Sequence, residues 1–445
     1  MPPYFYKKRK RGAVSMNYSQ AVNWIHSRLK FGIKPGLERM EWLMNQLGRP
    51  HTNILVVHIA GTNGKGSTLS FMRSILQEAG YSVGTFTSPY IETFNERISM
   101  NGIPVSDSEI AQLAAVMRPL VEKMEEELEE SPTEFEVITA MAFYYFGSVN
   151  KPDVLLLETG LGGRLDSTNI AEPAVSVITN VGYDHMNILG DTISEIAAEK
   201  AGIIKKGIPV VTAAENREAL TVIRQFAAKQ QAPLYELGNH FSAAAKSRGE
   251  YGEIFDYAAP SLQLTSLMTN MKGRHQVKNA ALAIAALEVL PLSLSEKEIR
   301  EGIRQSSWSG RFEEIISTPK VIVDGAHNTE GINSLIDTVQ RYYGDKIVHM
   351  IFSALKDKPY QEMISLLSEA SDSITFTSFD FPRAETAENL FKAAKVQHKS
   401  FEEDWKKLLL QKMETMREDD VLIVTGSLYF ISEVRNYCRK NFLEK

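Results

Sequence analysis

A glycine-rich segment holds the residues whose types and spacing say most about chemistry: Gly61-Thr62-Asn63-Gly64-Lys65-Gly66-Ser67. Its glycines allow backbone N–H groups to curve around phosphate oxygens, and a helix that begins here would add partial positive charge. Lys65 supplies a mobile cation for the β- and γ-phosphates of a nucleotide. The spacing departs from the usual phosphate-loop pattern, because Ile59 stands in place of the first glycine and Gly66 separates Lys65 from Ser67. We predict a nucleotide phosphate site here, with an ordinary tight turn as the alternative.

Three further side chains that could bind a metal ion follow predicted strands. Glu158 comes directly after an apolar run, and Ser88 and His185 come shortly after two other predicted strands. Open α/β sheets bind ligands at the carboxyl ends of their strands, so we expect the three residues to converge above the glycine-rich segment. Mg²⁺ prefers oxygen ligands such as Glu158, Ser88 and phosphate, whereas an imidazole is less usual. We predict a Mg²⁺ site, and a purely structural histidine is the alternative for His185.

The elements that must position these residues alternate along the chain as in a βαβ fold. In the first two thirds we predict helices at 18–29, 37–47, 67–79, 133–146, 193–202 and 276–289. The strands predicted there lie at 54–60, 82–86, 154–157, 175–179 and 209–212, with short β-like segments between about 235 and 272. In the last third we predict strands near 321–323, 346–352, 373–377 and 421–425, and helices near 329–343, 360–370 and 401–417.

This alternation predicts two α/β domains. The larger domain, 16–296, contains the glycine-rich segment, and the smaller domain spans 310–445. A linker at 297–309 joins them, and after a boundary at 291–293 we predict a short helix followed by a loop at 306–310. Residues 1–15, which include the five basic residues at 7–11, precede a second methionine and a helical pattern. We expect them to form a disordered extension.

Composition narrows the function classes. The chain has 445 residues, of which 43% are hydrophobic and 23% charged, as in an ordinary globular protein. With 49 Lys and Arg against 55 Asp and Glu, its net charge of −6 argues against general binding of nucleic acid or of anionic membranes. Cys438 is the one cysteine, so an intramolecular disulfide is excluded. We find neither a secretory signal nor a membrane-spanning apolar run, and we expect a cytoplasmic protein.

The glycine-rich segment resembles the ATP loop of the Mur-ligase superfamily. The form of the loop with a glycine, Gly66, after the lysine resembles that of the folylpolyglutamate synthase/dihydrofolate synthase family. Further segments resemble that family in the same order: Gly32–Arg39, Thr87–Tyr90, Phe94–Ile98, Glu158–Asn169, Asp184-His185, Glu199–Lys205, Gly310–Glu313 and Asp324–Asn328. Tyr90 is a departure, because many relatives have histidine there. The resemblance implies an N-terminal Mur-ligase ATPase domain of P-loop type with a mainly parallel sheet, and a smaller Rossmann-like α/β domain at the C-terminus.

The resemblance also implies roles around ATP. It assigns Mg²⁺ contacts to Ser88, Glu158 and His185, and a contact with the adenine to Asn279. Lys200 is implied to take up CO₂ and become a carbamate that supports Mg²⁺. Without the resemblance, a lysine inside the predicted helix at 193–202 would be interpreted as a surface charge. Asn279 could instead be an ordinary residue at the start of a helix.

The remaining implied roles concern the second domain and the acceptor. Arg311 and Asp324 are implied to contact ATP, and His327 is a candidate for ordering the γ-phosphate or the incoming amine. Asp166 would pair with N–H groups of a pterin, with a loop cap as the alternative. Phe135 would stack on the pterin, although a core aromatic is the simpler interpretation.

Together these features predict an ATP- and Mg²⁺-dependent ligase that adds L-glutamate to a folate through an acyl phosphate. Tetrahydrofolate and dihydropteroate both remain open as acceptors, and we expect a monomer without nucleic-acid or membrane partners. The alternatives are a peptidoglycan-precursor ligase of the same superfamily, a nucleotide-hydrolysing switch or motor, and an inactive binding protein. The Gly66-containing loop disfavours the first of these, and the full set of expected catalytic residue types disfavours the last.

Overall fold

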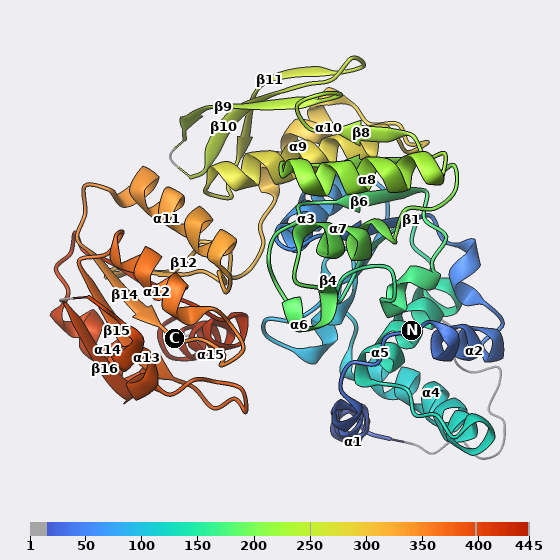
Figure 1. Cartoon of the computed structure of the whole chain (residues 1–445), viewed down its shortest axis with the longest axis horizontal. Coiled ribbons are helices and arrows are strands. Elements are labelled where there is room, and N and C mark those ends of the chain that lie inside the picture. The colour runs from blue at the N-terminus through green and yellow to red at the C-terminus, as the bar shows by residue number, and fades with distance from the viewer. Residues whose placement is uncertain (1–15, 250, 397, 444–445) are drawn as a thin grey trace. The chain divides into compact units, whose positions relative to one another are not determined.

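The computed structural model describes residues 16–249, 251–396 and 398–443, so the predicted extension at 1–15 lies outside the described residues. The chain forms two compact units (Figure 1). The first contains the described residues up to Ser242 together with Tyr257–Gln263 and Asn279–Ile303. The second contains Ala243–Asp256, Leu264–Lys278 and the described residues from Arg304 onward.

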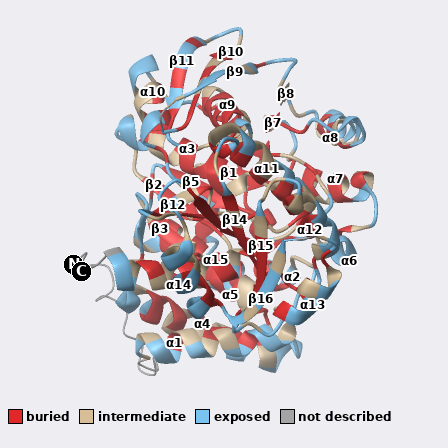
Figure 2. Cartoon of the chain, turned by 90° about the vertical axis from the view of Figure 1, so that its left-hand side faces the viewer, coloured by how far each residue is buried: buried red, intermediate tan, exposed pale blue. Residues whose placement is uncertain are grey.

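The first unit is built around an eight-stranded sheet in the order β4-β3-β2-β5-β1-β6-β7-β8. The strands are β1 (Val56–Ala60), β2 (Val83–Phe86), β3 (Ile98–Met100), β4 (Ile103–Pro104), β5 (Val154–Glu158), β6 (Val175–Ile178), β7 (Val210–Thr212) and β8 (Leu234–Glu236). The six strands from β2 to β8 in this order are parallel, and β3 and β4 add an antiparallel edge. Every residue of β1, β2, β5, β6 and β7 is buried, as expected of parallel strands covered on both faces (Figure 2).

The first unit also contains helices up to α8, some packed on the sheet and others on neighbouring helices. They are α1 (Tyr18–His26), α2 (Glu38–Gln46), α3 (Lys65–Glu78), α4 (Asp107–Leu128), α5 (Glu134–Tyr144), α6 (Met186–Leu189), α7 (Ile193–Ala201) and α8 (Arg217–Lys229). α3 packs on β1, β2 and β5, which places its first turn above the middle of the sheet. Further along the chain follow the strands β9 (Ser242–Arg248), β10 (Glu253–Ala258) and β11 (Gln263–Thr269) of a three-stranded sheet, and the helices α9 (Arg274–Glu288) and α10 (Glu296–Gln305).

The second unit contains a six-stranded sheet in the order β12-β13-β17-β14-β15-β16. Its strands are β12 (Glu313–Ser317), β13 (Lys320–Val323), β14 (Val348–Phe352), β15 (Ser373–Ser378), β16 (Lys399–Asp404) and β17 (Val421–Thr425). Only the β12–β13 pair is antiparallel. The helices are α11 (Thr329–Tyr343), α12 (Tyr360–Ser368), α13 (Ala387–Ala393), α14 (Trp405–Thr415) and α15 (Leu428–Cys438). The mixed α/β class and the mainly parallel large sheet are therefore as predicted.

Two predicted helices differ from the structure. The first ends as an α-helix at His26 and continues as a tighter 3₁₀ turn, which leaves Leu29 59% exposed rather than packed. The helix predicted from residue 401 begins only at Trp405, because Lys399–Asp404 pairs with β15 as an edge strand. The Asp404 side chain then accepts the backbone N–H groups of Lys406 and Lys407 and starts the helix.

The short helix predicted after residues 291–293 is present as α10, and it covers most of the proposed linker. The two compact units divide near Ile303, and two segments before α10 belong to the second unit. The boundaries 16–296 and 310–445 remain predictions. No helix within the described ranges is long and apolar enough to cross a bilayer.

Candidate active site

The glycine-rich segment lies at the carboxyl end of β1, between β5 and β6, and leads directly into α3. Gly64 caps the helix with φ 83°, a left-handed conformation that favours glycine. A Cβ on Gly64 would lie 2.5 Å from the Asn279 Oδ1 atom, and one on Gly61 would lie 1.8 Å from the Thr179 Oγ1 atom. The predicted strand, turn and helix are therefore present, and the turn is packed too closely at two positions for any side chain.

The Lys65 ammonium group folds back over this turn. Its Nζ atom donates to the carbonyl oxygens of Gly61, at 2.9 Å, and Thr62, at 3.4 Å. The same nitrogen lies 4.0 Å from the Glu158 Oε1 atom. This proximity follows from sheet register, because Ile59 of β1 is paired with Glu158 at the end of β5. The two charged side chains are mostly buried, with 17% and 6% of their surface exposed, so their interaction is poorly screened by solvent.

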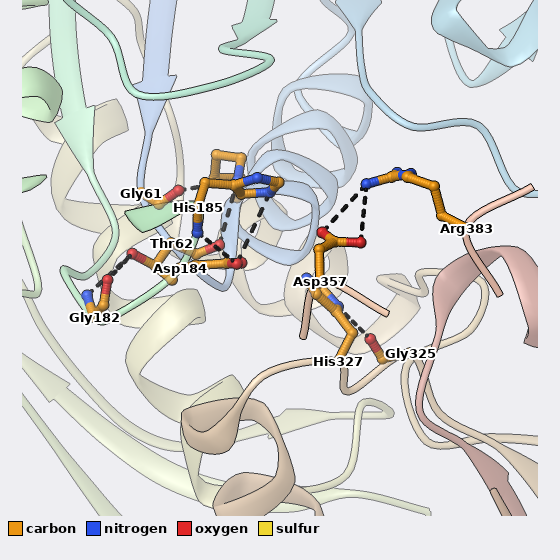
Figure 3. Close-up of polar contacts among 10 residues, drawn as sticks. Gly61, Thr62, Gly182, Asp184, His185, Gly325, His327, Asp357 and Arg383 are labelled. Carbon is orange, nitrogen blue, oxygen red and sulfur yellow. Dashed lines mark hydrogen bonds and ion pairs between the residues drawn. The ribbon is translucent and has the colours of Figure 1, made fainter. Parts of the chain in front are cut away.

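The segment after β6 is joined to the turn by several hydrogen bonds. Asn180 accepts the backbone N–H of Asn63 at 2.7 Å through its side chain and the N–H of Thr62 at 3.2 Å through its carbonyl. The Thr62 hydroxyl donates to the Gly182 carbonyl at 3.1 Å and accepts the Gly182 N–H at 3.0 Å (Figure 3). These contacts fix the start of the loop that carries His185.

His185 follows this tethered segment and has a left-handed backbone with φ 50°. The Asp184 Oδ1 atom accepts the His185 backbone N–H at 2.9 Å and lies 3.9 Å from the ring Nε2 atom (Figure 3). The imidazole keeps 37% of its side-chain surface exposed. It is therefore not a core histidine, and its ring is accessible to a ligand.

The donor set predicted for Mg²⁺ consists of a hydroxyl, a carboxylate and an imidazole. Glu158 ends β5, and Ser88 comes two residues after the end of β2, which is paired in parallel with β5. Glu158 is a mostly buried carboxylate at a sheet edge where anionic phosphate would also lie, a setting in which a divalent cation is chemically suitable. Within the described residues there is no group of three or more His, Cys, Asp and Glu side chains arranged to hold a metal, so phosphate and hydroxyl oxygens would have to complete the coordination.

Lys200 lies in the last turn of α7 and is only 3% exposed. The surface-charge interpretation of this residue is therefore excluded. A buried lysine is costly unless its charge is balanced or removed, and carbamate formation would convert the ammonium group into an anion. Its burial does not test the predicted carbamate, which remains a prediction.

Asp166 caps the loop that follows Glu158. Its carboxylate accepts the N–H groups of Leu161, at 2.8 Å, and Thr168, at 3.0 Å, and also the Thr168 hydroxyl. Burial raises the pKa of the Asp166 carboxyl, and these hydrogen bonds together with one from Gly160 oppose that rise. The loop-cap alternative thus describes a role that Asp166 has in this structure, and its contact with a pterin stays a prediction.

Phe135, at the start of α5, lies against the same loop. A Cβ on Gly160 would lie 2.5 Å from the Phe135 Cζ atom, and the ring is 5.8 Å from that of Phe86. Phe135 is half-buried at the margin of the core, rather than fully enclosed. The ring therefore packs on the loop without being fully enclosed.

Arg311, Asp324 and His327 belong to the second unit. Asp324 follows β13, and its carboxylate accepts the N–H groups of Phe312, at 2.8 Å, and Ala326, at 2.9 Å. Burial raises the pKa of Asp324, while the Arg311 guanidinium opposes the rise. The Nδ1 atom of His327 is 2.8 Å from the Gly325 carbonyl, so it carries the ring proton in the neutral form and directs Nε2 away from the backbone (Figure 3). Asp324 and His327 lie in the loop that follows β13, and Arg311 comes two residues before β12, whose first residue is paired with the last residue of β13.

The sequence did not single out Thr179 and Asn180, which hold the phosphate loop. Thr179 donates its hydroxyl to the Asn63 carbonyl, and Asn180 accepts from two residues of the loop. The available signal was that both polar residues directly follow a buried strand adjacent to β1. The same signal identified Glu158.

A parallel sheet with a glycine turn and a lysine at its carboxyl edge defines a nucleotide-binding α/β protein. Two family models match the chain: the Mur ligase middle domain at residues 59–287, and the Mur ligase, glutamate ligase domain at residues 310–428.

Individual relatives are similar over nearly the whole chain. The dihydrofolate synthase/folylpolyglutamate synthase of Bacillus subtilis is 49% identical over 94% of this chain and 98% of its own length. The folylpolyglutamate synthase structure from Thermotoga maritima has a TM-score of 0.84 and 34% identity, and the match covers 96% of this chain and 98% of that one. The E. coli FolC structure, in complex with DHPP and ADP, has a TM-score of 0.87 and 28% identity, with 96% and 98% covered. The chain belongs to the folylpolyglutamate synthase/dihydrofolate synthase family of Mur ligases.

Proposed function

We propose that this protein is an ATP-dependent ligase that joins L-glutamate to a folate-type acceptor. One observation carries most of the proposal: Lys65 and Glu158 meet at 4.0 Å beside a glycine turn at the carboxyl edge of the sheet. That arrangement suits the handling of nucleotide phosphates, and the family supplies the acceptor class and the glutamate.

In the proposed reaction the acceptor carboxylate attacks the γ-phosphorus of ATP, and the bond to the β-phosphate oxygen breaks to release ADP. The amine of L-glutamate then attacks the acyl phosphate carbon, losing a proton as phosphate leaves. Lys65 and the backbone N–H groups of the turn hold the phosphates and offset their charge. Thr62, Asn180 and their hydrogen bonds keep the turn in place, so that little rearrangement is needed when ATP binds.

A bound Mg²⁺ would neutralise phosphate charge. We propose that Glu158, Ser88 and His185 hold it together with phosphate oxygens. The carbamate proposed at Lys200 would add an anion on this side of the site. Asn279 is proposed to contact the adenine, which is consistent with its amide lying against Gly64 at the start of α3.

The acceptor is proposed to lie along the loop after Glu158, with its ring system near Phe135 and Asp166. The half-buried Phe135 ring next to Gly160 is what supports this placement. Contacts of Arg311 and Asp324 with ATP, and of His327 with the γ-phosphate or the amine, are proposed from the family resemblance. Dihydropteroate and tetrahydrofolate are both proposed acceptors, in keeping with the double name of the Bacillus subtilis relative.

The proposal is tested by incubating the protein with MgATP, L-glutamate and either dihydropteroate or a tetrahydrofolate, followed by mass spectrometry of the pterin product. We expect a glutamylated product from at least one of the two acceptors. A peptidoglycan-precursor ligase would instead extend a UDP-linked muramyl acceptor. Product from the muramyl acceptor alone would overturn the proposal.

A further inference from the structure

A histidine lies in the middle of β1, a fully buried central strand of the first unit. His58 belongs to β1 and is completely inaccessible to solvent, with Leu157 of β5 and Ser176 of β6 as its neighbours in register. Because burial removes water from the ring, and Lys205 adds positive charge nearby, the pKa of His58 falls to about 3. The side chain is therefore neutral at any working pH. A neutral imidazole in a place where valine or isoleucine would pack well calls for an explanation.

The hydrogen bonds of His58 assign its proton. The Nε2 atom is 2.8 Å from the Thr168 Oγ1 atom, and the Thr168 hydroxyl proton is donated to Asp166. Thr168 can thus only accept from His58, so the ring proton is on Nε2. The Nδ1 atom is buried and has no hydrogen-bond partner among the described residues, which is tolerable for a bare lone pair and costly for an N–H.

The chain of donors runs in one direction, from His58 through Thr168 to Asp166. At its end, Asp166 also accepts the Leu161 N–H, so the carboxylate joins the two sides of the loop that follows Glu158. A threonine hydroxyl has one proton and can rotate. The His58 N–H occupies a lone pair of the Thr168 oxygen. The Thr168 hydroxyl proton is therefore directed to the Asp166 carboxylate, which is the better acceptor.

We infer that His58 is a positioning residue, which acts through Thr168 to hold the Asp166 carboxylate and its loop in the conformation that receives the ring system of the acceptor. This inference rests on the proposed function, since it takes Asp166 to face the acceptor. It assigns no contact between His58 and any substrate. It explains why a polar side chain occupies the centre of the sheet directly before the phosphate loop.

The test compares variants by their dissociation constants for dihydropteroate, measured by titration without turnover, and by their KM for ATP. His58→Leu preserves an apolar fit but removes the donor, and Thr168→Val removes the hydroxyl. Each should weaken acceptor binding about tenfold, the effect of losing one buried hydrogen bond, while the KM for ATP changes less than about twofold. His58→Gln offers an amide N–H at a position close to Nε2 and should restore most of the affinity. The double variant should bind dihydropteroate no more weakly than the single variant with the lower affinity, because both changes break the same chain of hydrogen bonds.

Thr212→Val is the matched control. Thr212 is also fully buried in this sheet, and its hydroxyl donates to the Ile178 carbonyl at 2.9 Å, away from the loop. Acceptor affinity in this control should equal that of the wild type. The inference is overturned if Thr212→Val weakens acceptor binding as much as Thr168→Val does, or if ATP and acceptor parameters change equally.

Nitrogen NMR of the imidazole gives a readout that does not depend on activity. The wild type should show His58 as a neutral ring protonated on Nε2, with slow solvent exchange, and Thr168→Val should shift that resonance. A ring protonated on Nδ1 would overturn the inference while leaving the proposed function intact. Conversely, a wild type that binds dihydropteroate but never ligates it would overturn the proposed function alone.

Discussion

Replacement of Glu158 by glutamine separates the chemistry of the site from the stability of the fold. At 4.0 Å, the attraction between the Glu158 carboxylate and the Lys65 ammonium is about 1 kcal/mol in water and about 4 kcal/mol at the effective permittivity of a partly buried site. Glutamine keeps the shape and loses this attraction, but it also avoids the cost of burying a carboxylate. Lys65 retains its bonds to the Gly61 and Thr62 carbonyls. We therefore expect a Tm within about 4 °C of the wild type.

Activity should respond very differently to Glu158→Gln. Loss of one charge from a preorganised phosphate site should lower kcat/KM by about 10²–10³, and added Mg²⁺ should restore only part of it. The assay is ADP release as a function of Mg²⁺ concentration, with thermal unfolding measured on the same samples. Glu236→Gln is the matched control, since Glu236 is 4% exposed, ends β8 of the same sheet and also has a cationic partner. Glu236→Gln should keep its activity. If Glu158→Gln retains wild-type turnover and Mg²⁺ dependence, Glu158 does not hold the metal.

Other variants test separate parts of the account. Lys65→Ala should lower kcat/KM at least about 100-fold with the Tm retained, and normal turnover at saturating ATP would refute the phosphate-loop assignment. Gly64→Ala should lower the free energy of unfolding by about 1–3 kcal/mol in chemical denaturation and should weaken ATP binding. The reason is that an alanine at φ 83° is strained and that its Cβ would collide with the Asn279 amide oxygen. Full ATP affinity of this variant would contradict the expectation. Lys200→Ala should lose most activity and regain some with a short carboxylic acid in solution, whereas near-normal activity of Lys200→Arg would exclude a carbamate. Hydrogen bonds from Arg224 lower the pKa of Glu236, so the stability from this pair is present above the ordinary glutamate pKa and is lost as the pH falls through the lowered value. Arg224→Leu should therefore lower the Tm at pH 7 and have little effect near pH 2; an equal loss at both would show that packing rather than charge is responsible.

Local order made part of this structure predictable. The phosphate loop and Glu158 follow short apolar runs bounded by glycines, and such runs identify parallel strands and their carboxyl ends without knowledge of the tertiary fold. The helix α8 was not predicted, although Asn216 caps it and Ala219 and Ile223 mark its buried face. The other residues of α8 are mostly polar, so the few buried positions did not form a clear helical pattern in the sequence.

Contacts between distant segments were beyond the reach of the sequence. Asn180 supports a loop that precedes it by more than a hundred residues, and only the sheet order places β6 next to β1. His58 appeared as one member of an apolar run, and nothing in the run indicated its bond to Thr168. Lys200 was misjudged by composition for the same reason, since its burial is set by how α7 packs and not by its neighbours in sequence.

The central claim is that this protein couples ATP cleavage to the joining of L-glutamate and a folate-type acceptor. The most direct measurement is ADP release in MgATP, with dihydropteroate or tetrahydrofolate and L-glutamate supplied together and with each omitted in turn. The account predicts sustained ADP release only when acceptor and glutamate are both present, in proportion to the glutamate incorporated. Equal ADP release in the absence of both would contradict it, and would instead identify a nucleotide-hydrolysing switch or motor.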